Sequence, residues 1–215
     1  MKKSKKELFV SLGLLAAFVV WTFAVKLVDV KMIGPEGSCV GFATINSCVH
    51  EFFGVHMSLY NITDLLSLVP LFVVGMFAFM GLVQCIKRKS ILKVDYNILV
   101  LGVYYMVVMA VFLLFEEFAV NFRPILIEGV LEASYPSSTT MLTMCVMPTL
   151  VMMLNKRDLS RKLFYSIAVV VYSFTALMVL ARLVSGVHWF SDIVGGILLS
   201  FGLVFMFGYF LKKKG

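Results

Sequence analysis

The chain has 215 residues, of which 61% are hydrophobic and only 14% are charged. Soluble domains carry about 25% charged residues, so the composition excludes an ordinary soluble domain and indicates an integral membrane protein. A net charge of +7 would suit a nucleic-acid binder, but the positions of the basic residues favour membrane topology and no nucleic-acid partner.

Six stretches are long and apolar enough to cross a bilayer as helices, which takes about 17–25 residues. The fourth is short and contains Pro148, which predicts a kink. The sixth contains Gly195, Gly196, Gly202 and Gly208, which favour close helix packing in lipid. We therefore expect an all-α fold, an integral membrane bundle of six transmembrane helices. The stretches lie near residues 8–28, 63–85, 97–119, 139–155, 163–183 and 191–211.

The connections are short, so the chain is expected to form one structural domain. Within it, residues 1–94 would supply two transmembrane helices and an outer interfacial loop. Residues 95–215 would supply a core of four transmembrane helices.

Most of the 19 lysines and arginines gather at one side of the predicted bundle. The positive-inside rule makes that side cytoplasmic, so both termini are predicted to be cytoplasmic. The four clusters are Lys2, Lys3, Lys5 and Lys6; Lys87, Arg88, Lys89 and Lys93; Lys156, Arg157, Arg161 and Lys162; and Lys212, Lys213 and Lys214.

The first outer segment, about 29–62, is the longest piece predicted not to span. Apolar residues in 42–53 recur at a spacing that predicts a short interfacial helix, either a structural anchor or a lid over the site. Cys39 and Cys48 lie in this segment, and their spacing permits a disulfide without requiring one.

The outer segment 116–140 is dense in polar groups, and it and the third outer segment, 182–192, hold the candidate chemistry. Arg123 and Arg182 are the only cations there, on the side from which topology should remove cations, and an anionic ligand is the simplest reason for them. His188 and Asp192 are one helical turn apart, so a carboxylate can hold one ring nitrogen while the other attacks phosphorus.

Three motifs in this half are PheArgPro at 122–124, TyrProSerSerThrThr at 135–140 and ArgLeuValSerGlyValHisTrpPheSerAsp at 182–192. They resemble the signatures Lys-x6-Arg-Pro, Pro-Ser-Gly-His and Ser-Arg-x5-His-x3-Asp of the type-2 phosphatidic acid phosphatase superfamily, which includes vanadium haloperoxidases. The third is the specific one, and the resemblance covers about 95–211. The chain resembles a divergent bacterial membrane member of this superfamily.

The resemblance implies a role for each matching residue. His188 would be the nucleophile that forms a phosphohistidine, and Asp192 would orient it. Phosphoryl oxygens would be bound by Arg123 and Arg182, with help from Ser137 and, through nearby backbone and hydroxyl groups, Ser138 and Thr139. The resemblance implies no metal and no cofactor.

Two positions depart from the family pattern. Glu116 stands where the family has lysine, and three interpretations are open: it pairs with Arg123, it acts as a substitute acid, or it binds a divalent cation with Glu117. Thr139 stands where the family has the histidine that protonates the leaving group. A phosphate leaving group needs that proton less than an alkoxide does, which favours a lipid pyrophosphate such as a polyprenyl pyrophosphate.

The sequence therefore predicts a multi-pass protein of the cell membrane that hydrolyses a lipid phosphate or pyrophosphate on its extracytoplasmic face. Substrate and membrane lipids are the expected partners. The alternatives are a lipid-phosphate-binding pseudoenzyme and a lipid phosphotransferase. A transporter is disfavoured because the polar groups lie at one face rather than at mid-membrane.

Overall fold

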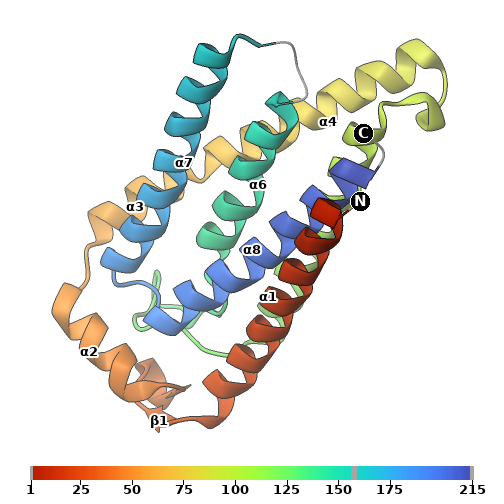
Figure 1. Ribbon diagram of the computed structural model, residues 1–215. Coiled ribbons are helices and arrows are strands. Elements are labelled where there is room, and N and C mark those ends of the chain that lie inside the picture. The colour runs from red at the N-terminus through yellow and green to blue at the C-terminus, as the bar shows by residue number, and fades with distance from the viewer. Residues whose placement is uncertain (1, 156–158, 214–215) are drawn as a thin grey trace.

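The computed structural model describes residues 2–155 and 159–213, and Figure 1 shows a bundle of helices. Lys156, Arg157 and Lys214 of the predicted basic clusters lie outside the described residues. The elements are α1 (Lys2–Leu27), β1 (Lys31–Met32), η1 (Pro35–Gly37), β2 (Cys39–Val40), α2 (Ala43–Phe53), α3 (Met57–Leu66), α4 (Leu68–Arg88), η2 (Ile91–Lys93), α5 (Tyr96–Glu117), α6 (Ser138–Leu154), α7 (Arg161–Val184) and α8 (Phe190–Lys213).

The all-α class is confirmed, with β1 and β2 as a small antiparallel addition in the first loop. Five segments are long and apolar enough to cross a membrane: Lys5–Leu27, Met57–Arg88, Tyr96–Glu117, Arg161–Val184 and Phe190–Lys213. These agree with five of the expected spans and show a multi-pass membrane protein. The remaining expected span corresponds to α6, which has 17 residues and continues through Pro148, so a sixth crossing stays a prediction.

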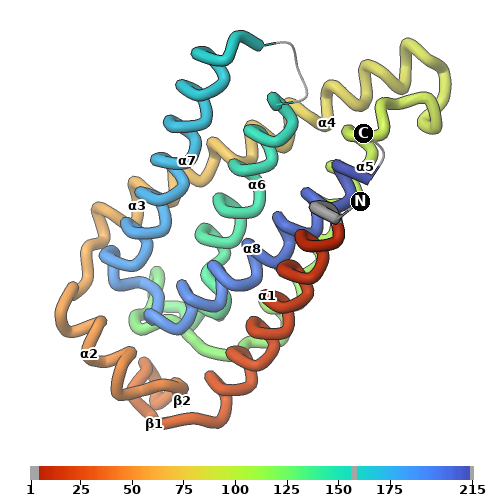
Figure 2. The backbone as a smooth tube through the Cα atoms, in the orientation of Figure 1, coloured from red at the N-terminus to blue at the C-terminus, as the bar shows by residue number. Residues whose placement is uncertain are grey.

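The two marked chain ends lie close together in Figure 1, away from α2 and β1. An ion pair between Lys212 and Glu7 joins the C-terminal part of α8 to the N-terminal part of α1. We call this the terminal end of the bundle and the opposite one, which carries β1 and α2, the α2 end. The tube in Figure 2 shows that the loops 118–137 and 185–189 also lie at the α2 end.

Helix α8 packs against its neighbours through glycines, as the sequence predicted. Ser11 Oγ of α1 donates a buried hydrogen bond of 2.7 Å to the Gly202 carbonyl. A methyl group added at Gly202 would lie 2.7 Å from a Leu15 methyl. Close backbone approach between α1 and α8 therefore depends on this glycine. The same packing holds at Gly195 against Tyr135, at Gly196 against Thr140 and at Gly208 against Met152.

The short helix predicted in the first outer segment is present as α2, and it is tied to the start of α8. Asn46 is fully buried, donates from Nδ2 to Ser191 Oγ at 2.9 Å and accepts the Ser191 backbone N–H at 3.0 Å. His56, just after α2, donates its backbone N–H to the Ser185 carbonyl at 3.0 Å. These bonds favour the anchor interpretation over a lid. The thiols of Cys39 and Cys48 are free and exposed.

The long segment 57–88 contains a turn that the sequence interpretation missed. Helix α3 ends at Leu66 and α4 begins at Leu68, with Ser67 between them. Pro70 has no backbone N–H to bond the Leu66 carbonyl, which weakens the helix there.

The division of the chain into 1–94 and 95–215 stays a prediction.

The first loop depends on a close approach at Gly41. A Cβ atom at this position would lie 1.5 Å from the Val25 carbonyl oxygen, a backbone atom that cannot rotate away. We expect Gly41→Ala to lower the free energy of unfolding by about 1–3 kcal/mol, measured as a lower Tm in detergent. Gly75→Ala is the control, because a Cβ at Gly75 meets nothing within 4 Å. Equal melting temperatures for the two variants would contradict the packing at Gly41.

Candidate functional site

The loop that carries His188 is held against the segment 121–134 at the α2 end. Trp189 Nε1 donates to the Phe122 carbonyl at 2.7 Å. The backbone N–H of Arg123 donates to the Glu132 carbonyl at 3.0 Å, and Phe122 pairs with Ala133 in an antiparallel bridge. Trp189 and Phe122 are 67 residues apart in the chain, so these bonds join two distant segments at the base of the site.

His188 is 3% exposed and both ring nitrogens face polar groups. Nδ1 lies 3.1 Å from the Ser134 carbonyl, which can only accept, so Nδ1 carries the proton. Nε2 then holds a free electron pair and faces Arg182 Nη2 at 3.5 Å. Burial, reinforced by the charges of Arg123 and Arg182, holds the pKa of the imidazole well below its usual value. The imidazole is therefore neutral at pH 7, the state in which Nε2 is nucleophilic.

Asp192 is completely buried and holds the loop rather than the ring alone. Its Oδ2 accepts the Trp189 backbone N–H at 2.9 Å, a helix-capping arrangement at the start of α8. Its Oδ1 accepts from Asn121 Nδ2 at 3.3 Å. Oδ2 lies 3.9 Å from His188 Nδ1, so the hydrogen bond that we expected from Asp192 is made by the Ser134 carbonyl.

Arg123 and Arg182 are brought together, as their shared side predicted, and Tyr60 of α3 lies under both. The guanidinium carbons are 5.8 Å and 4.8 Å from the centre of its ring. Arg182 Nη1 donates to Thr63 Oγ1 at 3.1 Å. Cation–π contacts of this kind offset part of the mutual repulsion of two buried cations.

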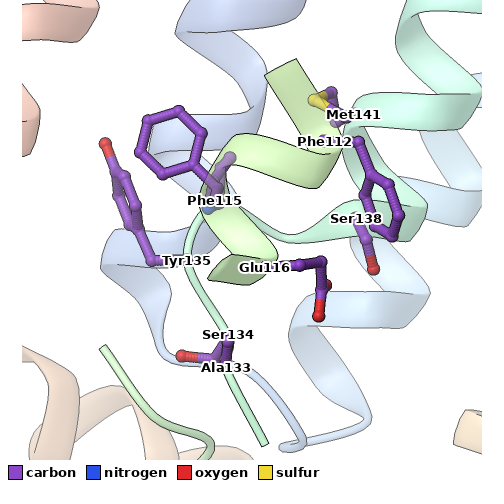
Figure 3. A pocket seen from close by; sticks show the side chains of 9 residues that line it. Phe112, Phe115, Glu116, Ala133, Ser134, Tyr135, Ser138 and Met141 are labelled. Carbon is purple, nitrogen blue, oxygen red and sulfur yellow. The ribbon is translucent and has the colours of Figure 1, made fainter. Parts of the chain in front are cut away.

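The expected pairing of Arg123 with Glu116 is replaced in the structure. Arg123 Nε lies 2.9 Å from Glu132 Oε2, and no ion pair of Glu116 occurs within the described ranges. Glu116 is exposed and lines, with Ser134 and Ser138, a hollow of about 10 Å³, shown in Figure 3. That is the volume one water molecule needs.

Buried donors without an acceptor surround the histidine. Arg123 Nη1, Arg182 Nε and Ser137 Oγ have no hydrogen-bond partner in the described part of the chain. Leaving such a donor unpaired costs about 1–3 kcal/mol, and more for a charged group. Buried donors in a native protein normally have partners, so these three donors are available to an anionic ligand.

Ser137, Ser138 and Thr139 form the start of α6, close to the histidine loop. The Ser137 backbone N–H donates to the Asp192 carbonyl at 3.2 Å, which fixes the helix start against α8. Free backbone N–H groups of a helix N-terminus favour anions. Thr139 is buried and lies on the wall of a cavity of about 320 Å³ that opens toward α3 and α4.

Sequence reasoning missed Tyr60, Thr63, Asn121 and Glu132, which support the predicted residues. Tyr60 and Thr63 lie in a segment whose sequence predicts an apolar helix and contains no motif that indicates a functional site. Among the described residues there is no cluster of three or more His, Cys, Asp or Glu side chains that could hold a metal ion.

Comparison with known proteins fits this geometry. Residues 113–215 match the model of the PAP2 superfamily. This segment, a little less than half of the chain, is therefore similar to the PAP2 superfamily. The resemblance stated from the motifs is thereby confirmed, and the matched segment contains Arg123, the start of α6 and the His188 loop.

The whole fold is similar to one solved structure. It is described as the first transmembrane PAP2 type phosphatidylglycerolphosphate phosphatase from Bacillus subtilis. The TM-score is 0.67 at 16% identity, over 93% of this chain and 94% of that one. This likeness shows a shared fold that includes the helices before residue 113. The search of curated proteins gave no match.

The unpaired donors predict measurable anion binding. Inorganic phosphate at about 100 times its Kd should stabilise the protein by roughly 2.7 kcal/mol and raise Tm by roughly 5–10 °C. Arg123→Gln and Arg182→Gln should each lose most of this rise. Arg161→Gln, an exposed arginine at the other end of the bundle, should keep it. A phosphate effect that survives both site substitutions would place anion binding elsewhere.

Proposed function

We propose that the chain is a membrane phosphatase that hydrolyses a lipid phosphate through a phosphohistidine at His188. The observation that carries this proposal is the neutral, buried imidazole. Its unprotonated Nε2 faces Arg182 at 3.5 Å among donors that have no acceptor. Such a group of residues binds a phosphoryl group and presents a nucleophile to it. The match of residues 113–215 to the PAP2 superfamily and the phosphatase named in the structural match support this proposal.

In the first step Nε2 attacks phosphorus and the bond from phosphorus to the leaving oxygen breaks. The guanidinium groups of Arg123 and Arg182, with Ser137 Oγ, neutralise charge on the equatorial oxygens. The ring gains positive charge as the bond forms. The Ser134 carbonyl on Nδ1 and the carboxylate of Asp192 at 3.9 Å stabilise that charge.

The leaving group of the proposed substrate follows from Thr139. A threonine hydroxyl cannot act as an acid near pH 7, and general acid catalysis contributes about 10²–10⁴-fold. An alkoxide leaving group would need that contribution, whereas a lipid monophosphate leaves without it. The best substrate class is therefore a lipid pyrophosphate, of which a polyprenyl pyrophosphate is one.

The second candidate is a lipid-phosphate-binding pseudoenzyme, favoured by one observation. Glu116 and Thr139 replace the cation and the acid of the family signature, which weakens catalysis without removing the anion site. A phosphotransferase that passes the phosphoryl group to another acceptor uses the same first step. Both alternatives share the ligand and differ in turnover.

The first prediction of this proposal concerns turnover. Purified protein should release phosphate from a polyprenyl pyrophosphate about 10²–10⁴ times faster than from the monophosphate or from phosphatidic acid. His188→Ala should lower kcat by at least about 10³-fold, measured as phosphate release in detergent. A chelator should leave the rate unchanged, because the mechanism uses no metal.

Other outcomes would change the assignment. Equal rates on the monophosphate and the pyrophosphate would contradict the leaving-group argument. Loss of rate with chelator would favour a metal site at Glu116 and Glu117. Lipid binding without turnover, unchanged in His188→Ala, would favour the pseudoenzyme.

The second prediction concerns sidedness, because the basic residues predict that the α2 end faces the extracytoplasmic side. Cys39 and Cys48 are exposed in the first loop. A membrane-impermeant maleimide added to intact cells should label both, and labelling should vanish in the double variant Cys39→Ser, Cys48→Ser. Labelling that requires permeabilised cells would place the α2 end, and the site, on the cytoplasmic side.

A further inference from the structure

A phosphohistidine enzyme needs a base as well as a nucleophile. Water must attack the phosphohistidine from the side that the leaving group has vacated, and it must lose a proton as it does so. A good leaving group removes the need for an acid in the first step but leaves the need for a base in the second. Thr139, which borders the leaving-group side by its match to the family motif, has no basic group.

A cavity of about 320 Å³ reaches Thr139 from the side of α3 and α4. Most of its wall is apolar and comes from α4, α5 and α6. Its polar edge is lined by Ser138 and Thr139 of α6, by Asp64 near the end of α3, and by Ser67, which lies between α3 and α4. The cavity therefore joins the start of α6, where the phosphate is proposed to bind, to one carboxylate.

Asp64 is unusual for its position in the chain. Between Met57 and Arg88 the sequence holds no other Asp or Glu, and the segment has a mean hydropathy of 2.4 in its most apolar window. Carboxylates within such segments are costly and mark functional sites. The side chain is exposed rather than enclosed by protein, so water in the cavity can reach it.

The face of α3 that carries Asp64 is the face that supports the arginines. Tyr60 lies under both guanidinium groups and is one helical turn from Asp64. Thr63, the residue before Asp64, accepts a hydrogen bond from Arg182. Asp64 also contributes an electrostatic attraction at Arg182. The carboxylate therefore lies near Arg182, one of the proposed phosphate-binding residues, and forms no ion pair among the described residues.

The turn at Ser67 is a second, independent feature of this place. Ser67 donates its hydroxyl to the Asp64 carbonyl at 2.5 Å and its backbone N–H to the Thr63 and Asp64 carbonyls. The φ and ψ angles of Ser67, −64° and −15°, stay helical, so the break is a local tightening of the helix beside Asp64. A helix break at membrane depth is tolerated where it lines a cavity.

We propose that Asp64 is the general base that takes a proton from water during hydrolysis of the phosphohistidine. This role rests on the proposed function and deepens it. The water oxygen forms a bond to phosphorus, and the bond from phosphorus to His188 Nε2 breaks. The imidazole keeps the electron pair and its Nδ1 proton, the water proton moves to the Asp64 carboxylate, and phosphate leaves.

Asp64→Asn separates the two steps. With a lipid pyrophosphate labelled with ³²P at the terminal phosphate, the variant should still release lipid monophosphate in a rapid burst of one equivalent. Steady-state turnover should fall by about 10²–10⁴-fold, and acid-labile label should accumulate on the protein. Asp64→Glu should restore part of the turnover, because it restores a carboxylate.

The matched control is Glu51→Gln, an exposed carboxylate on α2 away from the cavity. It should behave as wild type in burst and in turnover. Asp64→Asn removes a charge from an apolar segment and keeps the side-chain size, so we expect it to fold, which a phosphate-induced rise in Tm checks.

Three results would overturn the role of Asp64 while leaving the proposed function intact. Unchanged turnover in Asp64→Asn is the first. Equal loss of burst and turnover, which marks a support for Arg182, is the second. Accumulation of label in Glu116→Gln but not in Asp64→Asn is the third, because it would assign the base to Glu116. Turnover that persists in His188→Ala would instead overturn the proposed function itself.

Discussion

Two guanidinium groups are buried beside a neutral histidine, and the α2 end of the bundle is organised around that concentration of positive charge. Arg182 is 1% exposed and Arg123 is 8% exposed, so water screens neither of them well. The protein offsets their repulsion with the Glu132 carboxylate, the ring of Tyr60 and the hydroxyl of Thr63. Donors remain unpaired after these contacts, and the phosphoryl group of the proposed substrate would supply both the charge and the acceptors that are missing.

The same charge sets the protonation state of His188, the proposed nucleophile. Positive neighbours and burial keep the His188 ring neutral, and the Ser134 carbonyl decides which nitrogen is free. Asp192 holds the loop by its bond to the Trp189 backbone and only approaches the ring at 3.9 Å. Orientation of the histidine is therefore shared between a backbone carbonyl and a carboxylate. Both depend on the hydrogen bonds that hold the loop against the segment 121–134 and the start of α8.

Much of this arrangement was predictable from local sequence, for definite physical reasons. Apolar length located the helices, and the glycines of α8 do pack closely, as at Gly202. The spacing of Arg182, His188 and Asp192 located the loop. Tyr60, Asn121 and Glu132 could not be found in this way, because each acts through a contact between segments distant in the chain. The hydrogen bond from His188 to the Ser134 carbonyl could not be predicted for a further reason. Every residue has a backbone carbonyl, so the residue type does not indicate which one accepts the bond.

The two carboxylates near the start of α6 differ in what surrounds them, and this difference bears on their chemistry. Glu116 borders a hollow of about 10 Å³, large enough for one water molecule. Asp64 borders a cavity of about 320 Å³ whose remaining wall is apolar. Under the proposed mechanism a leaving lipid and an incoming water use the same side of the phosphorus atom in turn, so that side needs the larger space. On that proposal Asp64 would meet the attacking water only after the lipid has moved away, which would reserve it as the base of the second step.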